Sequence, residues 1–391
     1  MNNYIKEAIL ARANEVIQLR RKFHSEPELS WEEVKTTEFI ANYLEELQIP
    51  YRRMNPTGIV AEITGSKPGK KVALRADIDA LPVEELNTEL SYASKVEGKM
   101  HACGHDAHTA MLLVAADVLN TMKEELKGSV RLIFQPAEEA ARGALAMVEQ
   151  GAMTEVDHVF GIHIWSQMET NKIACTAGPQ FASADIFHVA FQGQGGHGAI
   201  PHDCIDATVM ASSFVMNLQS IVSRTIDPQA GAVVTVGKLE SGTRFNVIAE
   251  NAKLEGTVRC FEPAVRDHIE EQLTHYANHV AGLYGGKAVV EYIRGTQAVI
   301  NHEESAALVQ EVAVDCFGTD VLFDEKPTMG GEDFSFYLDY APGSFALVGS
   351  GNKDKDTEWA HHHGRFNIDE DALVTGAELY AQFAWTYLLR D

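Results

Sequence analysis

Several features that mark special classes of protein are scarce in this sequence. It has five cysteines in 391 residues, a scattered and odd set without a CxxC pair. We therefore expect no disulfide framework and a reducing, cytoplasmic compartment. Only 12 prolines accompany 45% hydrophobic and 23% charged residues, which excludes disordered and collagen-like chains. No apolar run reaches the roughly 18 residues of a membrane span, and the start of the chain has an amphipathic pattern rather than that of a signal peptide.

Basic residues are also few. The chain has 32 Lys and Arg against 56 Asp and Glu, a formal net charge of −24. Nucleic-acid binding is not expected, because phosphates require a Lys and Arg footprint. An anionic membrane surface is disfavoured for the same reason. The length predicts two or three domains, each with its own core.

Strands and helices alternate in the first 180 residues, a pattern typical of a sheet covered by helices. Buried strands are expected at 71–76, 130–134 and 158–164. Helices are expected at 105–126 and 142–150, and glycines at 128 and 151 would end them.

The pattern changes after Pro179. Strands with one solvated face are expected at 185–191, 231–239 and 253–259, with helices near 205–224 and 263–284. This β-α-β-β-α-β order predicts a small ferredoxin-like α/β sandwich. From about Arg294 the first pattern returns, with a helix at 303–317, a strand at 344–348 and a helix from Glu370. We therefore predict one domain of residues 1–180 and 293–391, interrupted by a second domain of residues 181–292.

One segment is dense in residue types that bind metals. Residues 101–108, HACGHDAH, contain one thiol, three imidazoles and one carboxylate. In an extended segment Cys103 and His105 point the same way, because strand side chains alternate with period two. Thiolate and imidazole suit zinc and its transition-metal neighbours. Taken alone, the segment fits a buried polar cluster equally well.

Further candidate ligands follow the predicted strands. They are Asp77 and Asp79, Glu138 and Glu139, and His163. Ligands of open α/β sheets collect beyond the carboxyl ends of strands, so we expect these side chains at one edge together with Cys103 and His105. Adjacent buried carboxylates are costly without cations, although acids also favour solvated helix starts. A His triplet at 361–363 is either a surface feature or the source of a further ligand.

Such a ligand set predicts two closely spaced divalent cations. Cation pairs lower the pKa of a bound water and polarise the carbonyl that it attacks. One of the twin glutamates could bind metal while the other takes a proton from water and returns it to a leaving amine. This division of labour predicts a hydrolase.

A dinucleotide site is an alternative at residues 193–198, because GQGGHG matches G-x-G-x-x-G and follows a predicted strand. That motif also requires an acidic residue about 20 positions later. Residues 207–226 contain no Asp or Glu, and Pro201 interrupts the expected helix. We therefore interpret the glycines as bringing backbone and His197 close to a ligand. Asn246 and Arg259 lie in the same insert, and Arg259 is either a surface charge or a carboxylate-binding group.

Taken together, these segments resemble the M20 metallopeptidase family, and specifically its amidohydrolase branch of N-acyl-amino-acid, hippurate and auxin-conjugate hydrolases. The resemblance runs from RRKFHSEPE at 20–28 to HHGRFNID at 362–369, nearly the whole chain. Seven motifs occur between them in family order: ALRADIDALP, MHACGHDAHTAMLL, IFQPAEE, GIHIW, GGHGAIPH, FNVIAENAKLEGTVR and GGEDFSFY. One such motif would be weak, but seven in order are specific.

The resemblance implies a role for each matching residue. The family's metal ligands align with Cys103, His105, Glu139 and His163, and its general base with Glu138. The last ligand lies in a pattern resembling H-x-P-x-F, which places it at His362, although glycine replaces the proline and His361 and His363 flank it. Asp79 is implied to orient ligands from behind. Asp77 stands where other branches use a metal-binding His, so it receives no role.

The resemblance also assigns roles in the insert, which would form a lid and dimerisation domain. His197 is implied to stabilise the oxyanion, and Asn246 and Arg259 to bind substrate, often across a dimer. We thus expect an α/β protein whose catalytic domain has a central mixed sheet flanked by helices, with an inserted ferredoxin-like lid. We expect two divalent ions, manganese or zinc, with cobalt and nickel as alternatives.

The expected reaction is hydrolysis of the amide bond of a small N-acyl amino acid to a carboxylate and a free amino acid. The expected partners are that substrate and a second copy of the chain through the lid, with no nucleic acid and no membrane. A dipeptidase or carboxypeptidase of the same family is the first alternative. A non-catalytic metal-dependent binding protein is the second, and it is disfavoured because binding alone would not need Glu138 beside Glu139.

Overall fold

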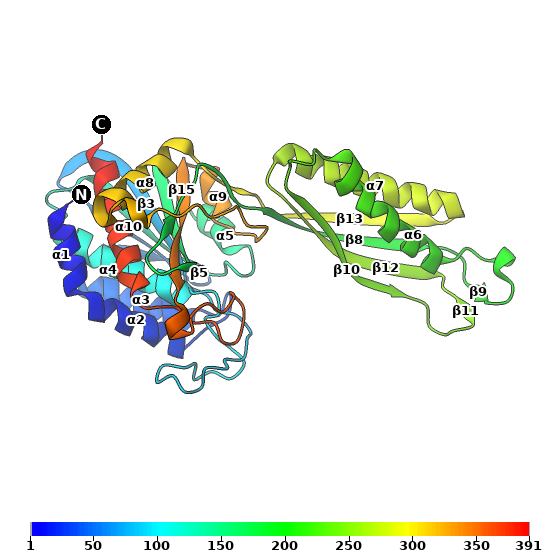
Figure 1. Cartoon of the computed structure of the whole chain (residues 1–391), viewed down its shortest axis with the longest axis horizontal. Coiled ribbons are helices and arrows are strands. Elements are labelled where there is room, and N and C mark those ends of the chain that lie inside the picture. Colours follow the sequence, from blue (N-terminus) through cyan, green and yellow to red (C-terminus); the bar gives the residue numbers. More distant parts are fainter. Residues whose placement is uncertain (1, 391) are drawn as a thin grey trace. The chain divides into compact units, whose positions relative to one another are not determined.

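The computed structural model describes residues 2–390, which form two compact units (Figure 1). Unit 1 comprises the chain up to Gln180, residues Ile300–Lys326 and the chain from Asp333 onward. Unit 2 comprises Phe181–Val299 and Pro327–Glu332, so it contains all of residues 181–292 and two short segments besides. None of the helices in the described part of the chain has the length and hydropathy of a membrane span.

Unit 1 is built on a seven-stranded mixed sheet with the order β1-β2-β4-β3-β5-β15-β6. The four central strands β4, β3, β5 and β15 run parallel, and the outer strands are antiparallel to their neighbours. A mixed sheet flanked by helices confirms the predicted fold class. The strands are β1 (Tyr51–Arg53), β2 (Ile59–Thr64), β3 (Lys67–Asp77), β4 (Lys127–Gln135), β5 (His158–Glu169), β6 (Ile173–Ala174) and β15 (Gly343–Gly351).

The helices of unit 1 bury a continuous hydrophobic core against this sheet. They are α1 (Asn3–Ala11), α2 (Ala13–Ser25), α3 (Val34–Glu46), α4 (His105–Thr121), α5 (Gly143–Glu149), α8 (Glu303–Phe317), α9 (Ser335–Leu338) and α10 (Ala372–Leu389). Two short strands, β7 (Gly178–Phe181) and β14 (Val299–Asn301), lie in the segments where the chain passes between the units.

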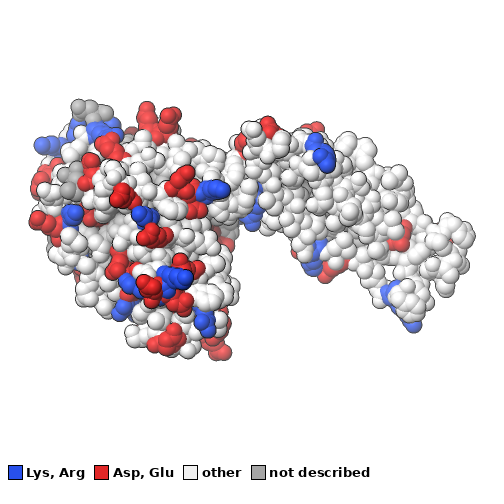
Figure 2. All heavy atoms as spheres, in the orientation of Figure 1, with Lys and Arg blue, Asp and Glu red and all other residues white. Residues whose placement is uncertain are grey.

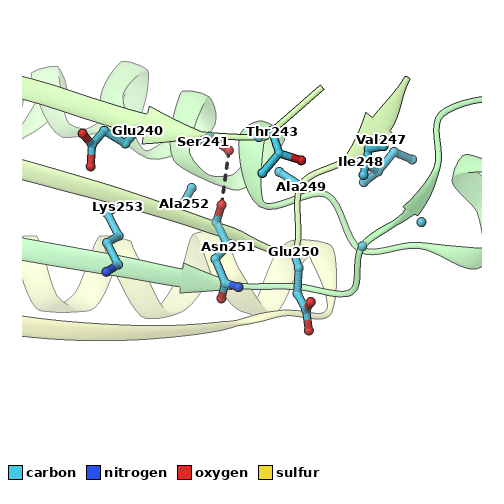
Figure 3. A pocket seen from close by; sticks show the side chains of 13 residues that line it. Glu240, Ser241, Thr243, Val247, Ile248, Ala249, Glu250, Asn251, Ala252 and Lys253 are labelled. Carbon is cyan, nitrogen blue, oxygen red and sulfur yellow. Dashed lines mark hydrogen bonds between the residues drawn. The ribbon is translucent and has the colours of Figure 1, made fainter. Parts of the chain in front are cut away.

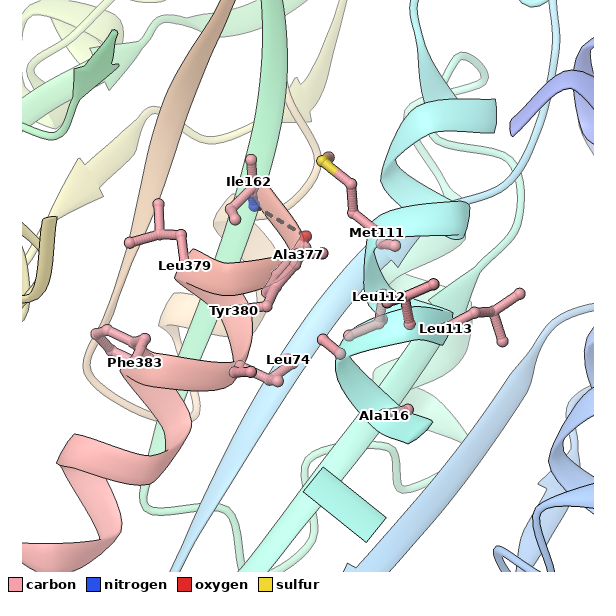
Figure 4. Close-up of a cluster of buried hydrophobic side chains, with 14 of the residues drawn as sticks. Leu74, Met111, Leu112, Leu113, Ala116, Ile162, Ala377, Leu379, Tyr380 and Phe383 are labelled. Atoms are coloured by element: carbon pink, nitrogen blue, oxygen red, sulfur yellow. Dashed lines mark hydrogen bonds between the residues drawn. The ribbon is translucent and has the colours of Figure 1, made fainter. Parts of the chain in front are cut away.

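Helices α4 and α10 pack beside each other over β3 and β5 (Figure 4). The Tyr380 hydroxyl of α10 donates to the Arg75 carbonyl at 2.6 Å and accepts from the Ile162 amide at 3.1 Å. It therefore fixes α10 on the two strands whose ends carry the candidate ligands. The predicted helix 105–126 is too long, because turns replace it after Thr121, where the Met122 amide bonds to Leu119.

Unit 2 is a four-stranded antiparallel sheet with the order β10-β12-β8-β13, against which α6 and α7 pack. Its elements follow the predicted β-α-β-β-α-β order, and a separate hydrophobic core lies between the helices and the sheet. The elements are β8 (Ser183–Gln192), α6 (Ala207–Ser220), β10 (Ala232–Ser241), β12 (Asn251–Cys260), α7 (Pro263–Tyr284) and β13 (Lys287–Thr296), with the small pair β9 (Gly196–His197) and β11 (Val247–Ile248). On the face shown in Figure 2, charged side chains of both signs are interspersed over unit 1 and sparse over unit 2.

Candidate metal centre and substrate-binding residues

The candidate ligands of unit 1 lie where the central strands end. Asp77 is the last residue of β3, and Glu138 follows β4 by three residues. His163 lies inside β5, so the prediction that this strand ends at residue 164 is wrong: β5 continues beside β15 to Glu169. However, β3 pairs with β5 only as far as Gly161. His163 therefore lies just beyond the part of β5 that β3 covers.

The turn into α4 brings Cys103 and His105 to the same edge. Gly104 precedes the helix with a φ of 98°, and a Cβ atom there would lie 2.4 Å from Cγ2 of Ile164. Glycine is required at this position because an L side chain would be strained and would clash. The Cys103 Sγ atom then lies 3.5 Å from Nε2 of His163.

The other candidate ligands surround these groups. Nε2 of His105 lies 3.9 Å from one oxygen of Glu138 and 3.9 Å from Oε1 of Glu139. Nε2 of His362 lies 3.5 Å from the same Oε1 of Glu139. Three overlapping sets have all ligand atoms within 4.8 Å of one another: Cys103, His105 and His163; Cys103, Glu139 and His362; and His105, Glu138 and Glu139. The structure thus brings the five predicted metal ligands and the predicted base into one cluster.

The atoms in this cluster are arranged as a cation would require. Among the described residues, Nε2 of His105 and Oε1 of Glu139 are buried and have no hydrogen-bond partner. The other ring nitrogen of His105 donates to Asp79 at 3.1 Å, and that of His163 donates to the Ile164 carbonyl at 2.6 Å. Each bond leaves Nε2 facing the cluster, so that a ring without a proton on Nε2 is the tautomer that a metal-binding imidazole needs. A thiol, three imidazoles and two carboxylates therefore fit a pair of transition-metal ions.

Acidic side chains are in excess over cationic ones in and around the cluster. Burial and the carboxylates of Glu139 and Glu138 raise the pKa of the Cys103 thiol. Burial also raises the pKa of Glu139 to about 7, against the effect of His105. Burial opposes a charged His105, but the carboxylates of Asp77 and Asp79 outweigh it and raise its pKa to about 10. Divalent cations would offset this excess of negative groups.

Asp79 supports the cluster from behind. Its Oδ1 accepts from Nδ1 of His105 at 3.1 Å and from the Glu138 amide at 3.2 Å. Its Oδ2 accepts from the Glu139 amide at 3.0 Å and from the Ser30 hydroxyl at 2.7 Å. The carboxylate is 1% exposed and so is held by four donors in a dry environment. One side chain thereby orients both glutamates and one imidazole.

Asp77, for which no role was predicted, is fully buried and has a partner on each oxygen. Arg75 donates to Oδ2 at 2.6 Å and His108 donates to Oδ1 at 2.5 Å. The second ring nitrogen of His108 accepts from the Ile164 amide at 2.8 Å. Neither Arg75 nor His108 was predicted as a residue of the site. The spacing of His108 three residues after His105, on the same helical face, was the available signal.

The three histidines of the triplet have different surroundings. His361 is half-buried, its Nδ1 donates to the Cys103 carbonyl at 3.2 Å, and its Nε2 accepts from the Ser166 amide at 3.3 Å. Burial lowers its pKa to about 3, in keeping with a neutral ring whose two nitrogens are already engaged. His363 stacks on Trp359 with the ring centroids 4.7 Å apart. Of the triplet, His362 contributes to the candidate ligand sets.

The three candidate residues of unit 2 lie at opposite ends of its sheet. Arg259 pairs with Ala184 at the beginning of β8. His197 pairs with Val247, next to Asn246, in the small β9 and β11 ladder beyond the end of β8 at Gln192. The eight residues from 184 to 192 span about 26 Å at ~3.3 Å per residue. Arg259 and His197 of one chain therefore cannot contact the same small molecule.

Arg259 is a half-buried cation, and among the described residues no carboxylate forms an ion pair with it. Burial lowers the pKa of its guanidinium, and Asp185 opposes this effect. Its Nη1 lies 3.1 Å from the position that a Cβ atom on Gly331 would occupy. The glycine of the GGEDFSFY motif therefore leaves space beside the guanidinium. A desolvated guanidinium without a partner is costly and is suited to a carboxylate ligand.

A pocket of about 660 Å³ lies near the small ladder of unit 2 (Figure 3). Its lining includes Glu240, Glu250 and Lys253 but no Cys or His. Figure 3 shows a single hydrogen bond among the side chains drawn, from the Ser241 hydroxyl to the Asn251 carbonyl at 3.4 Å. None of the candidate metal ligands lines this pocket, and it offers neither the thiol nor the imidazoles of the metal-ligand cluster.

Comparison with known proteins gives consistent results. Residues 73–386 match peptidase family M20/M25/M40. The chain is 42% identical to an N-acetyl-L-cysteine deacetylase of Bacillus subtilis, over 92% of this chain and 85% of the relative. It is 39% identical to thermostable carboxypeptidase 1 of Saccharolobus solfataricus, over 94% of each chain.

A solved structure extends the similarity to three dimensions. It is a Bacillus subtilis protein described as a dinuclear metal-binding peptidase of family M20, with 36% identity and a TM-score of 0.86, covering 97% of this chain and 99% of that one. The resemblance predicted from the motifs is thus confirmed. This chain belongs to peptidase family M20/M25/M40 and is a hydrolase of that family.

Proposed function

We propose that this chain hydrolyses the amide bond of N-acyl amino acids, releasing a carboxylate and a free amino acid. The observation that supports it most strongly is the cluster, buried except at His362, in which Glu138 lies beside the donor set of Cys103, His105, Glu139, His163 and His362. A spare carboxylate next to a complete ligand set is what water-driven amide cleavage requires. The family relatives named as a deacetylase and a carboxypeptidase both cleave bonds of this kind.

Two divalent cations, manganese or zinc in our proposal, would be held by those five ligands and would polarise the amide carbonyl and acidify a water. Glu138 takes the proton from that water and delivers it to the amine nitrogen as the C–N bond breaks. Its backbone amide is held by Asp79, so its carboxylate is aimed before substrate binds. Water supplies the hydroxyl of the new acid, and the proton leaves with the amine.

Substrate recognition is assigned to unit 2. Arg259 binds the carboxylate of the amino-acid moiety through two parallel N–H···O bonds, for which its half-buried and unpaired guanidinium is suited. His197 and Asn246 lie too far from Arg259 along the sheet to reach the same substrate. In our proposal the chain therefore forms a homodimer through the lid, and these two residues act at the site of the second copy. There His197 donates a hydrogen bond to the oxyanion of the reacting substrate.

The substrate assignment is tested with metal-stripped protein reconstituted separately with manganese, zinc, cobalt and nickel. Release of free amine is measured from N-acetyl, N-benzoyl and indole-acetyl amino acids beside matched dipeptides. Higher kcat/KM for acyl amino acids supports the proposal. Higher kcat/KM for dipeptides favours the carboxypeptidase alternative, and metal binding without any turnover favours a binding protein.

The shared site is tested by mixing two inactive variants, Glu138→Gln and His197→Ala. A mixed dimer contains one site with Glu138 from one chain and His197 from the other only if the two residues act in trans. Recovery of activity on mixing supports the trans arrangement. Persistent inactivity, with mixed dimers demonstrated by differential tags, refutes it.

A further inference from the structure

Glu33 is a buried carboxyl group that the proposed reaction does not use. It lies immediately before α3, is 0% exposed, and belongs to the segment ELSWEE at 28–33, which carries none of the candidate ligands. No Lys, Arg or His of the described residues forms an ion pair with it. Burying a carboxyl group without a cation is costly, so both of its oxygens are expected to accept hydrogen bonds.

Both side-chain oxygens accept a hydrogen bond from another part of unit 1. The Thr57 hydroxyl donates to Oε2 at 2.7 Å, and the Ala137 amide donates to Oε1 at 2.8 Å. Ala137 is the residue before Glu138 and Glu139. Glu33 is therefore connected directly to the backbone that carries the proposed base and one proposed ligand.

The Ala137 backbone is in a conformation that requires such support. Its φ is 53°, in the left-handed region, which is strained for an L residue. Pro136 before it packs against Gly58, where a Cβ atom would lie 2.6 Å from the proline ring. The segment is thus held in a turn that its own residues do not favour.

Glu33 and Asp79 together hold three successive amides of this turn. The amide of residue 137 donates to Glu33, and those of Glu138 and Glu139 donate to the two oxygens of Asp79. The two carboxylates come from segments far apart in the sequence. Without the bond to Glu33, the residue that starts the turn would be held by no side chain among the described residues.

We propose that Glu33 is a positioning residue for the amide hydrolysis proposed above: its carboxylate fixes the Ala137 amide and thereby aims the side chains of Glu138 and Glu139. The role depends on where the acceptor oxygen lies and not on the charge of the group. Glutamine can keep that oxygen on the Ala137 amide while its NH₂ donates to Thr57. Aspartate keeps the charge but withdraws the acceptor by one methylene.

The experiment compares Glu33→Gln, Glu33→Asp and Glu33→Ala in the full chain. Metal affinity is measured by competition with a chromophoric chelator, and kcat and KM are measured on the best substrate of the acyl amino acid panel. A shifted turn should lower kcat by about a hundredfold in the Asp and Ala variants, with KM changed less, because small displacements of catalytic groups have effects of this size. Their metal affinity should fall about tenfold or more, since Glu139 is displaced. The Gln variant should stay within about threefold of wild type in both readings.

Thr57→Val is the matched control. It removes the other hydrogen bond to Glu33, and with it folding stability, but leaves the Ala137 amide bonded. It should lower the melting temperature while keeping kcat within about threefold of wild type. If Glu33→Ala fails to fold, Glu33→Asp carries the test.

Three results would overturn the inference. One is an Asp variant with unchanged kcat and metal affinity, another is a Gln variant as impaired as the Asp variant, and the third is a Thr57→Val variant with the same loss of kcat. Metal affinity is measured without substrate, so it tests the role of Glu33 even if the wild-type protein cleaves none of the panel. In that case the proposed function fails separately.

Discussion

Replacing Asp79 with Asn should weaken metal binding and turnover while keeping the shape of the side chain. Asp79 accepts four hydrogen bonds, two on each oxygen, and each oxygen has one donor, the Glu138 or the Glu139 backbone amide, that cannot accept in return. Whichever oxygen becomes NH₂, at least one buried N–H group then faces another donor. In the better orientation the NH₂ faces Ser30, which can accept, and the Glu139 amide, which cannot.

The sizes of the losses in stability and in metal affinity can be worked out from these contacts. One lost bond to a charged acceptor and one buried amide left unsatisfied should lower the free energy of unfolding by about 2–4 kcal/mol. Loss of such support behind metal ligands typically lowers metal affinity or activity about 10–100-fold. Urea unfolding of metal-free protein measures the first effect, and chelator competition with steady-state kinetics measures the second.

Ser30→Ala provides the control for this prediction. It removes one of the four bonds but leaves the contacts of Asp79 to His105, Glu138 and Glu139 intact. It should change stability slightly and metal affinity hardly at all. An Asp79→Asn variant with wild-type metal affinity and kcat would show that Asp79 does not orient the ligands, whatever its effect on unfolding.

Three further predictions follow from the site. Glu138→Gln should retain the full metal content, measured by elemental analysis, and lose kcat by about a hundred- to ten-thousandfold, because the proton shuttle is removed and the ligands remain; loss of metal would make Glu138 a ligand instead. Cys103 should resist alkylation in the metal-loaded protein and react after chelation, and equal rates by mass spectrometry would remove it from the ligand set. Arg259→Ala should lower kcat/KM about 10–100-fold for N-acyl amino acids but little for their amide derivatives, with partial recovery in Arg259→Lys. Equal losses for both substrate types would make Arg259 a structural residue.

The fold could be predicted from the sequence because its elements have strong local signals. Helix α7 begins with Pro263 and ends before Gly285, and its bounds agree with the predicted 263–284. The central strands are continuous apolar runs, as parallel strands buried on both faces require. The predicted bounds were wrong where pairing with another strand determines the length of an element. Strand β5 extends to Glu169 because β15 pairs with it beyond His163, and nothing in the local sequence records that partner.

The clustering of the candidate ligands could also be predicted, because side chains at the ends of adjacent parallel strands must meet at one edge. The groups that hold them in place could not. His108 and Glu33 act through contacts across 31 and 104 positions in the sequence, from His108 to Asp77 and from Ala137 to Glu33. Each is an ordinary charged or polar residue in its own segment. Only the packed structure shows that it is buried and which atom it contacts.

The N-terminal segment of residues 20–33 shows that residues other than the candidate ligands shape the site. Residues 20–33 supply none of the candidate ligands, yet they contact three of the segments that carry or support them. Arg20 donates to Asp106, the neighbour of His105, at 2.8 Å. Ser30 donates to Asp79 at 2.7 Å, and Glu33 accepts from Ala137 at 2.8 Å. All three contacts reach groups that precede, follow or orient a proposed ligand. This segment therefore contributes to the site by holding those groups in position. Within the family motif at 20–28, Arg20 makes such a contact, so a match to that motif is informative although none of its residues is among the candidate ligands.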